Sequence, residues 1–554
     1  MARALAYHER SKHRLPDHHA ASLGYLDWAS QPSPFRLYDG AEKLGLERPE
    51  PAAAGTLEPA LDAAYEPARL AARPLDVGSL SQLLYDALAL SAWKEHGASR
   101  WSLRCNPSSG NLHPTEAYVV AGPVAGLATE PGLYHYTPLL HALERRRRLA
   151  PGVWEALGLR AGAFAVALGS IHWREAWKYG ERAYRYCQHD VGHAVAALAF
   201  AAGALGWEVR RVPSVDDAAL AALLGIDGQG GPEAEHPDGL FVVGPAVAAG
   251  ERAQAPLPEG LPQGLLAALA SAPLEGEPNR LSEAHHDWPA IDEVARACRQ
   301  VGPERTALPP EPPGCAPGAD ELPPRPEVAA RRIFRTRRSA VAMSPERALP
   351  AADFLRMLER TLPRAGRVPF AALAGAPRVH LALFVHRVTG LGLVPGLYFL
   401  PRSAGARLRC VAALDAGFEW LRVDTGRLAL PLYRLLRGDT RRAARTIACG
   451  QAIASDGAFA VGMLAELPRA LDEGGAAAYR RLHWEAGAIG QVLYLEAEAA
   501  GVRGTGIGCF FDDALGELCG YAGPELQTLY WFTVGGPTDD ARLRTLDAYH
   551  HLAP

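Results

Sequence analysis

Features typical of membrane, secreted or nucleic-acid-binding proteins are missing from this 554-residue sequence. No apolar run reaches the roughly 18 residues that a membrane-spanning helix needs. The N-terminal stretch MARALAYHERSKHRLPDHH becomes charged too early for a signal peptide. A net charge of -4 and a pI near 6.6 leave no basic excess for nucleic acid or a membrane surface. We therefore expect a cytoplasmic protein whose partners are neutral or small molecules.

Paired cysteines and metal-binding motifs are missing as well. The eight cysteines are scattered, with no CxxC pair and no zinc-like spacing to histidine, so we expect reduced thiols. His189 and His193 lie four positions apart on a predicted helix, and His285 and His286 are adjacent. No HExxH or carboxylate–histidine set accompanies them, so the sequence predicts no metal site.

Prolines, in contrast, are abundant and concentrated in the middle of the chain. Residues 251–330 hold 15 of the 45 prolines, including LPPEPPGCAPGADELPPRP at 308–326, a composition typical of a linker. Within it, AIDEVARACRQV at 290–301 predicts one short amphipathic helix. The chain is also long for a single hydrophobic core. We expect one domain over residues 1–250 and a second over 331–554.

The two predicted domains share residues at a constant offset of 295 positions. The matching pairs are Tyr184 and Tyr479, Arg185 and Arg480, Gly192 and Gly487, and Gly206 and Gly501. Between the glycines, AVAALAFAAGAL and AIGQVLYLEAEA each predict a buried helix of about four turns. PGLY recurs at 131–134 and 395–398, and VVGP at 242–245 is echoed by VGGP at 534–537. Such a duplicated fold normally packs as an internal pseudo-dimer.

Each half mixes strands and helices without strict alternation. EAYVVAG and VHLALFVH predict an early strand, PGLY opens a second strand, helices follow, and GLFVVG and YWFTVGG predict a closing strand. This order favours an α+β fold in both halves.

The halves differ where their polar and glycine-rich motifs lie. RCNPSSGNLHPTEAY at 104–118 contains a polar turn, whereas the PGLY offset of 264 places Ala371, Ala372, Leu373 and Gly375 opposite it. The second half carries GVRGTGIGCFFDDAL at 501–515, where the first has GWEVRRVPSVDDAAL. RTRRSAVAMS at 335–344 has only a distant echo, HERSKHR, at the start of the chain. Each half thus keeps a motif that the other has lost.

In combination, these motifs resemble the flavin-dependent nitroreductase superfamily, in particular the azoline-oxidising dehydrogenases of the SagB and ThcOx type, in tandem-domain form. The resemblance spans nearly the whole chain apart from the linker, and its motifs are specific together but weak singly. It implies two nitroreductase-like domains, FMN as cofactor, and a site built across the interface of the pseudo-dimer. Because each half has lost one motif, we expect one intact composite site and one degraded site.

The resemblance also implies which residues contact FMN. They are Pro107, Ser108, Ser109 and Asn111 in the turn, Arg337, Arg338 and Ser339 at the phosphate, Gly506, Ile507, Gly508 and Cys509 near the reactive N5 atom, and, more loosely, Arg542 and Arg544 past the last strand. Arginine forks and hydroxyls suit a phosphate. Proline stiffens the turn, and serine and asparagine can bond the polar ring edge. Glycines allow backbone conformations and close approaches that bulkier residues do not.

Each of these assignments has a purely structural alternative. The arginines could begin a solvated basic helix or belong to a charged surface. The polar turn could be a helix N-cap with a proline nearby. The glycines could form an ordinary loop before a strand, since a GxGxG pattern is weak and differs from the GxGxxG dinucleotide fingerprint.

The catalytic candidates are Lys178 and Tyr179, in EAWKYGERAYRY at 175–186. They resemble the lysine–tyrosine pair of the azoline dehydrogenases, which assists deprotonation of the substrate while hydride leaves for the flavin. Lysine can act as a base only if burial or a neighbouring cation lowers its pKa, and arginines are dense around it. The alternative is a surface lysine beside a core tyrosine.

The resemblance predicts an FMN-dependent oxidoreductase that moves hydride between flavin and a small molecule or modified peptide, with a nicotinamide or oxygen as a second redox partner. Two alternatives remain open. One is a generic nitro- or quinone reductase that uses NAD(P)H, and the other is a non-catalytic pseudo-dimer that binds flavin or a partner.

Overall fold

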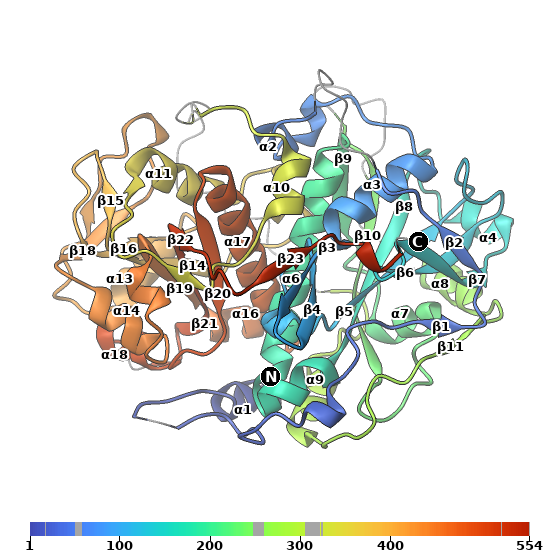
Figure 1. Cartoon of the computed structure of the whole chain (residues 1–554), viewed down its shortest axis with the longest axis horizontal. Helices are drawn as coiled ribbons and strands as arrows, with labels where there is room; N and C mark the ends of the chain where they lie inside the picture. Colours follow the sequence, from blue (N-terminus) through green and yellow to red (C-terminus); the bar gives the residue numbers. More distant parts are fainter. Residues whose placement is uncertain are drawn as a thin grey trace.

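The computed structural model describes residues 1–16, 18–49, 58–247, 257, 260–304, 322, 325–521 and 523–552. Figure 1 shows two lobes side by side, one coloured mainly blue to green and the other yellow to red, with long helices between them. We call them the first half (described residues up to 304) and the second half (from 325). The architecture is mixed α/β, as the sequence predicts.

Each half is built on a seven-stranded antiparallel sheet. In spatial order the first sheet contains β2 (Lys43–Gly45), β7 (Ala142–Arg148), β6 (Gly132–Thr137), β5 (Thr115–Ala121), β8 (Phe164–Ile171), β10 (Glu235–Pro245) and β9 (Trp207–Arg211). The second contains β17 (Leu421–Arg422), β18 (Tyr433–Arg437), β16 (Gly396–Leu400), β14 (Val379–Val385), β19 (Phe459–Ala465), β21 (Gln527–Gly535) and β20 (Arg503–Ile507). Six strands occur in the same chain order and the same spatial order in both sheets, and PGLY opens β6 and β16.

Smaller β-structures and helices surround these sheets. The short strands are β1 (Tyr38–Asp39) with β11 (Glu277–Pro278), β12 (Ala342–Met343) with β22 (Pro537–Thr538), β13 (Leu349–Pro350) with β15 (Val388–Thr389), and β3 (Leu90–His96) with β4 (Ser99–Arg104) and β23 (Arg544–Leu546). The helices of the first half are α1 (Ala2–Arg10), α2 (Leu61–Ala64), α3 (Val77–Ala87), α4 (Pro151–Ala156), α5 (His172–Tyr179), α6 (Ala183–Gly203), α7 (Asp217–Leu224), α8 (Gln263–Ala270) and α9 (Pro289–Ala297). Those of the second half are α10 (Ala330–Thr336), α11 (Ala351–Arg360), α12 (Phe370–Leu373), α13 (Ala406–Ala413), α14 (Arg441–Ile447), α15 (Ile453–Asp456), α16 (Leu467–Gly474), α17 (Ala478–Ala499) and α18 (Ala514–Cys519).

One sequence match between the halves is misaligned by one residue. Val242 packs into the core on the outer face of the first sheet, whereas Val534 packs into the core against the central helices. Because side chains alternate between the faces of a strand, an offset of 292 pairs residues that face opposite ways. The VVGP and VGGP matches are therefore displaced by one position, and Phe241 on β10 corresponds to Phe532 on β21.

The two halves meet at the helices α6 and α17, which carry the 295-residue repeat. A Cβ atom added at Gly192 would lie 2.3 Å from the Trp484 carbonyl oxygen, and one added at Gly487 would lie 2.2 Å from the His189 carbonyl oxygen. The two glycines therefore let the helix backbones touch where they cross. Beside the crossing, the rings of Tyr184 and Tyr479 stack with centroids 6.5 Å apart.

Two ion pairs related by the same offset join the halves. Arg185 pairs with Asp512 at 2.7 Å, and Arg480 pairs with Asp217 at 2.7 Å. All four side chains are buried. The repeated residues thus form one symmetric contact, built twice from opposite directions.

Segments at the ends of each half cross to the other half. The C-terminal strand β23 adds to β3 of the first half, and the Tyr549 ring stacks on Tyr85. At the other end of the chain, the His8 ring bonds to Tyr479 and Gln527 of the second half. Figure 1 accordingly shows the C-terminus over the first half, far from the second sheet.

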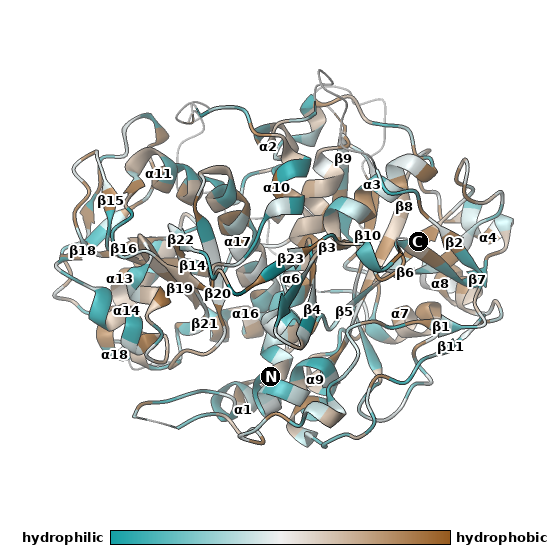
Figure 2. Cartoon of the chain, in the orientation of Figure 1, coloured by the Kyte–Doolittle hydropathy of each residue, from teal (hydrophilic) through white to brown (hydrophobic). Residues whose placement is uncertain are grey.

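Apolar side chains fill both faces of each sheet. One core lies between each sheet and the central helices, and another lies on the outer face of each sheet. Figure 2 shows this pattern, with apolar colouring on central strands such as β8 and hydrophilic colouring on the arginine-rich α10. No helix in the described part of the chain is long and apolar enough to cross a membrane.

The predicted linker is partly structured. The short helix expected at 290–301 is α9, which begins at Pro289, and β11 pairs with β1 of the first half. Most of the proline-rich stretch 308–326, with Cys315, lies outside the described residues. The domain boundaries stay a prediction.

Candidate functional site

The polar turn and the lysine–tyrosine pair lie against each other. Gly110, at φ 63°, occupies the tip of the turn, and a Cβ atom there would lie 2.7 Å from the Tyr179 hydroxyl and 3.2 Å from the Lys178 ammonium nitrogen. Asn111 also has a positive φ of 57°. Only a glycine allows the tip to touch both side chains at once. Lys178 and Tyr179 end α5 and are half-buried, so both remain accessible beside the turn.

A buried carboxyl group holds the turn in place. The backbone N–H and the hydroxyl of Ser109 both donate to Asp190 on α6, at 3.1–3.2 Å. The Ser108 hydroxyl accepts from the His113 N–H at 2.9 Å. Burial raises the pKa of Asp190 to about 7. Neighbouring Glu175 has no exposed surface, and burial followed by the charge of Asp190 raises its pKa well above the ordinary value.

Tyr179 belongs to the same electrostatic environment. Burial, then Glu175 and Tyr186, raise the pKa of its phenol well above 10. The Tyr179 and Tyr186 rings meet edge to face with centroids 4.6 Å apart. The phenol therefore stays protonated at neutral pH and can donate a hydrogen bond from beside the turn.

The RRS segment comes from the second half and reaches the residues just before the turn. Arg337 is buried and donates to the carbonyls of Arg104 and Cys105 at 3.3 Å. Arg338 donates to the carbonyls of Arg335, Arg337 and Ser91. Segments of the two halves are thus in contact here.

These guanidinium groups form a cationic cluster, in which burial lowers the pKa of Arg337 and Arg338 and the nearby Glu498 carboxylate partly offsets this lowering. Within the described part of the chain, no carboxylate forms an ion pair with Arg337 or Arg338. Burial and then the charge of Arg337 lower the pKa of Arg338 to about 10. Burial, followed by the charges of Arg338 and Arg503, also lowers the pKa of Lys94. Carbonyl oxygens satisfy the N–H groups but carry no full charge, so the cluster suits an anion such as phosphate.

The glycine segment continues the site but differs from the prediction. Residues 503–507 form β20 itself, not a loop before a strand, and Gly504, Gly506 and Gly508 all lack a positive φ. Their role is close approach: a Cβ atom at Gly506 would lie 2.0 Å from the Tyr530 hydroxyl, and one at Gly508 would lie 2.4 Å from the Tyr186 ring. The predicted special backbone conformations are therefore wrong, whereas the tight packing over the backbone is observed.

Tyr494 on α17 connects the RRS segment to the glycine strand. Its hydroxyl bonds the Ser339 hydroxyl at 2.8 Å and accepts from the Gly506 N–H at 2.9 Å. Next to it, the Ala340 N–H donates to the Gly504 carbonyl at 3.2 Å. Ile507 is buried in the outer core and Cys509 is half-buried beyond the strand. The turn, the RRS segment and the glycine strand therefore converge between the two halves.

Arg542 and Arg544 lie in a different environment. Arg542 is 75% exposed and pairs with Asp540, and Arg544 is 76% exposed and pairs with Glu95. No described contact joins either one to Arg337 or Arg338. Arg544 nevertheless lies next to Thr545, whose hydroxyl accepts from Lys94 at 2.6 Å.

The corresponding place on the opposite side of the pseudo-dimer is filled by side chains. Arg211 lies 295 positions before Gly506, and its Nε donates to the Leu373 carbonyl at 3.0 Å, where α12 replaces the polar turn. Arg481 and Trp484 stand where the functional side has Tyr186 and His189. The remaining cavity, lined by Arg211, Arg481 and Trp484 among others, measures about 10 Å³, which is room for one water at most.

Sequence reasoning missed the residues that support the site. Asp190 could have been noticed, because YRYCQHDVG places an acid at the start of an apolar helix, where a buried charge needs partners. Glu175 offers a similar signal inside the lysine–tyrosine segment. Tyr494 and Lys94 carry none, since their roles depend on packing between elements that are distant in sequence.

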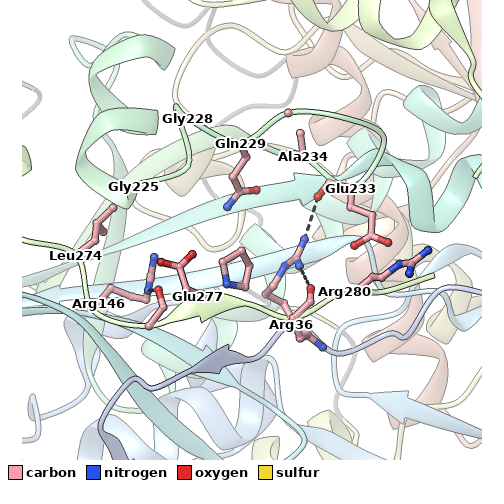
Figure 3. Close-up of a pocket in the computed structure, with 14 residues that line it drawn as sticks. Arg36, Arg146, Gly225, Gly228, Gln229, Glu233, Ala234, Leu274, Glu277 and Arg280 are labelled. Atoms are coloured by element: carbon pink, nitrogen blue, oxygen red, sulfur yellow. Dashed lines mark hydrogen bonds between the residues drawn. The ribbon is translucent and has the colours of Figure 1, made fainter. Parts of the chain in front are cut away.

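A separate polar cavity of about 490 Å³ lies at the edge of the first half and contains no predicted site residue. Figure 3 shows Arg36 donating to carbonyl oxygens of its lining, Glu233 among them. The Arg146 guanidinium lies 3.7 Å from the Tyr38 ring centroid and also donates to backbone carbonyls. Both arginines thus tie down the segments that line this cavity.

Comparison with known sequences identifies part of the chain. Residues 48–244, which are less than half of the chain, match the sequence model of the nitroreductase family. A Methanocaldococcus jannaschii protein described as "Putative nitroreductase MJ1384" is 26% identical over 159 residues, covering 28% of this chain and 76% of its own length.

Comparison with solved structures extends the likeness to both halves. A crystal structure from Anabaena variabilis, described as that of "a putative nitroreductase", superposes with a TM-score of 0.66 at 21% identity. The match covers 97% of this chain and 99% of that chain. A chain of the E. coli microcin synthetase McbBCD complex matches over 44% of this chain and 92% of its own, at 19% identity and with a TM-score of 0.26. The first of these shows a nitroreductase-like fold.

Proposed function

We propose that this protein is an FMN-dependent oxidoreductase in which two nitroreductase-like halves form an internal pseudo-dimer with one composite flavin site. The observation that carries the proposal is the convergence of three segments between the halves: the polar turn, the RRS segment and the glycine strand. A buried cationic cluster, in which no described carboxylate forms an ion pair with Arg337 or Arg338, lies at one end of this arrangement. The half-buried Lys178 and Tyr179 lie at the other.

The residues present fit FMN. Arg337, Arg338 and Ser339 would hold the phosphate, because the two arginines carry charge with no ion-paired carboxylate among the described residues, and all three side chains offer N–H or O–H donors. Backbone amides near Gly508 and Cys509 and the turn at 107–111 would face the ring system. When bound, FMN supplies the hydride-accepting chemistry.

The chain itself would orient the substrate and handle its proton. Lys178 Nζ and the Tyr179 hydroxyl lie side by side at the turn, where a substrate that reaches the site would meet them. Tyr179 is held protonated by burial and can donate, and Lys178 is placed to accept a proton as hydride departs. Asp190 keeps the turn against the pair through its bonds to Ser109.

This arrangement favours a dehydrogenase of the SagB and ThcOx type, with a small molecule or modified peptide as substrate. A generic NAD(P)H-dependent nitro- or quinone reductase would need flavin but not the lysine–tyrosine pair. A non-catalytic pseudo-dimer would need neither turnover nor a reactive flavin.

Replacing Arg338 tests the predicted phosphate contact. Arg338→Ala removes charge-assisted bonds worth on the order of 1.5–3 kcal/mol, so we expect the FMN dissociation constant to rise roughly 10- to 150-fold. Flavin content after gel filtration and fluorescence titration of the flavin-free protein measure this. Arg441→Ala is the matched control, because Arg441 is exposed and pairs only locally with Asp439. Equal FMN affinity in the Arg338 variant and the parent would remove Arg338 from the site.

A further inference from the structure

Two cysteines and two histidines from three distant segments meet beside the glycine strand. The Sγ atoms of Cys449 and Cys509 lie 2.8 Å apart. The rings of His13 and His19 have centroids 4.8 Å apart, and one nitrogen of each lies within 4.8 Å of the Cys509 Sγ. We call these four residues the thiol cluster. Such a set could bind a metal ion or carry out thiol chemistry, and the hydrogen bonds distinguish the two.

The hydrogen bonds of His13 favour thiol chemistry. The backbone N–H of Ala20 donates to His13 Nδ1 at 2.9 Å, so in the neutral ring the proton is on Nε2. A histidine that binds a metal normally donates from its other nitrogen to an acceptor. Here that nitrogen faces a donor instead. His13 is therefore arranged to donate from Nε2 to the Cys509 sulfur, which stabilises a thiolate.

The electrostatic environment separates the two cysteines into different roles. The hydrogen bond from the Cys449 thiol, and then His13, lower the pKa of Cys509 well below that of an ordinary cysteine. The Cys509 thiolate in turn raises the pKa of Cys449. Both side chains are half-buried, so a small reagent can reach them. Cys509 has the features of an attacking thiolate, and Cys449 those of a resolving thiol.

The surrounding backbone holds the two cysteines in place. The Gln451 side-chain amide donates to the Cys509 carbonyl at 3.0 Å, and the Phe511 N–H donates to the Ile447 carbonyl at 2.8 Å. On the other side, His13 and Asp512 exchange two hydrogen bonds, at 2.8 and 2.9 Å. Two sulfurs bound to one zinc ion at about 2.3 Å each would have to lie roughly 3.7 Å apart. The observed separation is shorter, so the segments are placed for sulfur–sulfur chemistry.

We propose that Cys449 and Cys509 form a reversible thiol–disulfide pair that aliphatic disulfides of low molecular weight oxidise. The Cys509 thiolate attacks one sulfur of the reagent, forms a mixed disulfide and expels one thiolate. The Cys449 sulfur then attacks Cys509 Sγ, expels the second thiolate, and its proton goes to that leaving group. The first thiolate expelled takes a proton from water, so the protein loses two electrons and one S–H proton while the reagent is reduced to two thiols. The site uses only the thiol cluster and does not rest on the proposed flavin chemistry.

Disulfide formation at Cys509 would change the surroundings of Tyr179. Cys509 follows Gly508 at the end of β20 and is among the charges that raise the pKa of Tyr179. A bond between Cys449 and Cys509 removes that negative charge and fixes the segment after β20. We therefore expect the oxidation state of the pair to alter the surroundings of the lysine–tyrosine pair.

The test treats the full-length protein with hydroxyethyl disulfide, followed by denaturation, maleimide labelling and peptide mass spectrometry. We expect the parent to lose two labelled thiols and to yield a peptide pair linked through Cys449 and Cys509. Cys449→Ser should stop at a mixed disulfide on Cys509, and Cys509→Ser should not react at either position. Cys298→Ser, which removes a buried cysteine elsewhere, should behave as the parent does.

The rate provides a second readout. An ordinary cysteine is about 3% thiolate at pH 7 and loses thiolate about tenfold per pH unit below that, whereas the lowered pKa of Cys509 keeps it ionised, so we expect the Cys509 reaction at pH 6 to be nearly as fast as at pH 7. His13→Asn should slow it. Retention of both labels in the parent, or a rate that falls about tenfold between pH 7 and pH 6 as that of a small free thiol does, would overturn the proposal. So would one zinc ion per chain that survives dialysis against a chelator, because it would assign the cluster to a metal.

Discussion

Asp190 is the residue on which the polar turn depends, and its charge state should control stability. Its pKa is raised to about 7 by burial, from an ordinary value near 3.8. Between those values the folded protein binds more protons than the unfolded chain, so this group's contribution to stability falls as pH rises, by up to about 1.4 kcal/mol per pH unit.

Asp190→Asn tests this dependence, because asparagine mimics the neutral acid at every pH. We expect the variant to gain stability relative to the parent as pH rises from about 4 to 7, with little further change above. Urea unfolding of both proteins across this range measures the difference. A constant difference would mean that Asp190 is ionised in the folded protein throughout.

Lys178 and Tyr179 make the second prediction at the scale of single residues. Replacing either should leave FMN bound but slow flavin reduction by an organic substrate by roughly 10²–10⁴-fold, the usual loss when acid–base help is removed. Reduction by dithionite should be unchanged, because that route needs no proton from the pair. Lys43→Ala is the matched control, since Lys43 lies on β2 at the edge of the first sheet and is distant in sequence from Lys178. If Lys178→Ala reacts at the parent rate with a substrate that turns over, the plain reductase alternative takes the place of the dehydrogenase.

The sequence could predict these residues only as motif members. The turn, the RRS segment and the lysine–tyrosine pair each carry a local pattern, and the structure brings them together, although their contact with FMN stays a prediction. Arg542 and Arg544 had a weaker pattern and are bound to acidic neighbours. The supporting roles of Tyr494 and Lys94 arise from long-range packing, which leaves no local signal.

At the scale of elements, the crossing of α6 and α17 joins the halves, and its glycines should not tolerate a side chain. Gly192→Ala and Gly487→Ala each place a Cβ within 2.3 Å of backbone in the other helix. Helix propensity alone would favour alanine by about 1 kcal/mol. Forcing the helices apart typically costs 1–3 kcal/mol or more, so we expect both variants to be less stable than the parent.

Gly264→Ala is the matched control for these helix glycines. Gly264 lies in α8, where an added Cβ meets nothing within 4 Å. We expect this variant to keep or raise the thermal unfolding midpoint while the crossing variants lower it. Equal midpoints in all three would show that the helices do not pack through Gly192 and Gly487.

The elements were predictable to different degrees. The apolar helices follow from the spacing of their apolar residues, and the strands after PGLY follow from the turn residues that precede them. The constant offset located these elements in both halves. The misaligned VVGP match shows the limit of comparing short motifs. Four similar residues could not reveal which face of the strand each side chain occupies. The glycine strand shows another, because GTGIG suggested a loop, whereas the glycines make room for rings from β21 and α6.

At the scale of the whole molecule, the two halves share six strands in the same order, but one side of their contact brings together the polar turn, the RRS segment and the glycine strand, whereas the other side is filled by side chains. The symmetric Arg–Asp pairs keep the two halves in register. On the filled side, Arg211 and α12 take the places of glycine and the polar turn. The sequence indicated this loss of motifs, but the side chains that fill the second place became visible only in three dimensions.

The number of FMN molecules bound per chain tests this asymmetry most directly. Full-length protein saturated with FMN and freed of excess should be denatured, and its flavin absorbance compared with the protein concentration from amino-acid analysis. We predict a ratio close to one, because only one side offers both the polar turn and the RRS segment with its glycine strand. A ratio close to two would show that the filled side also binds flavin and would contradict the single composite site.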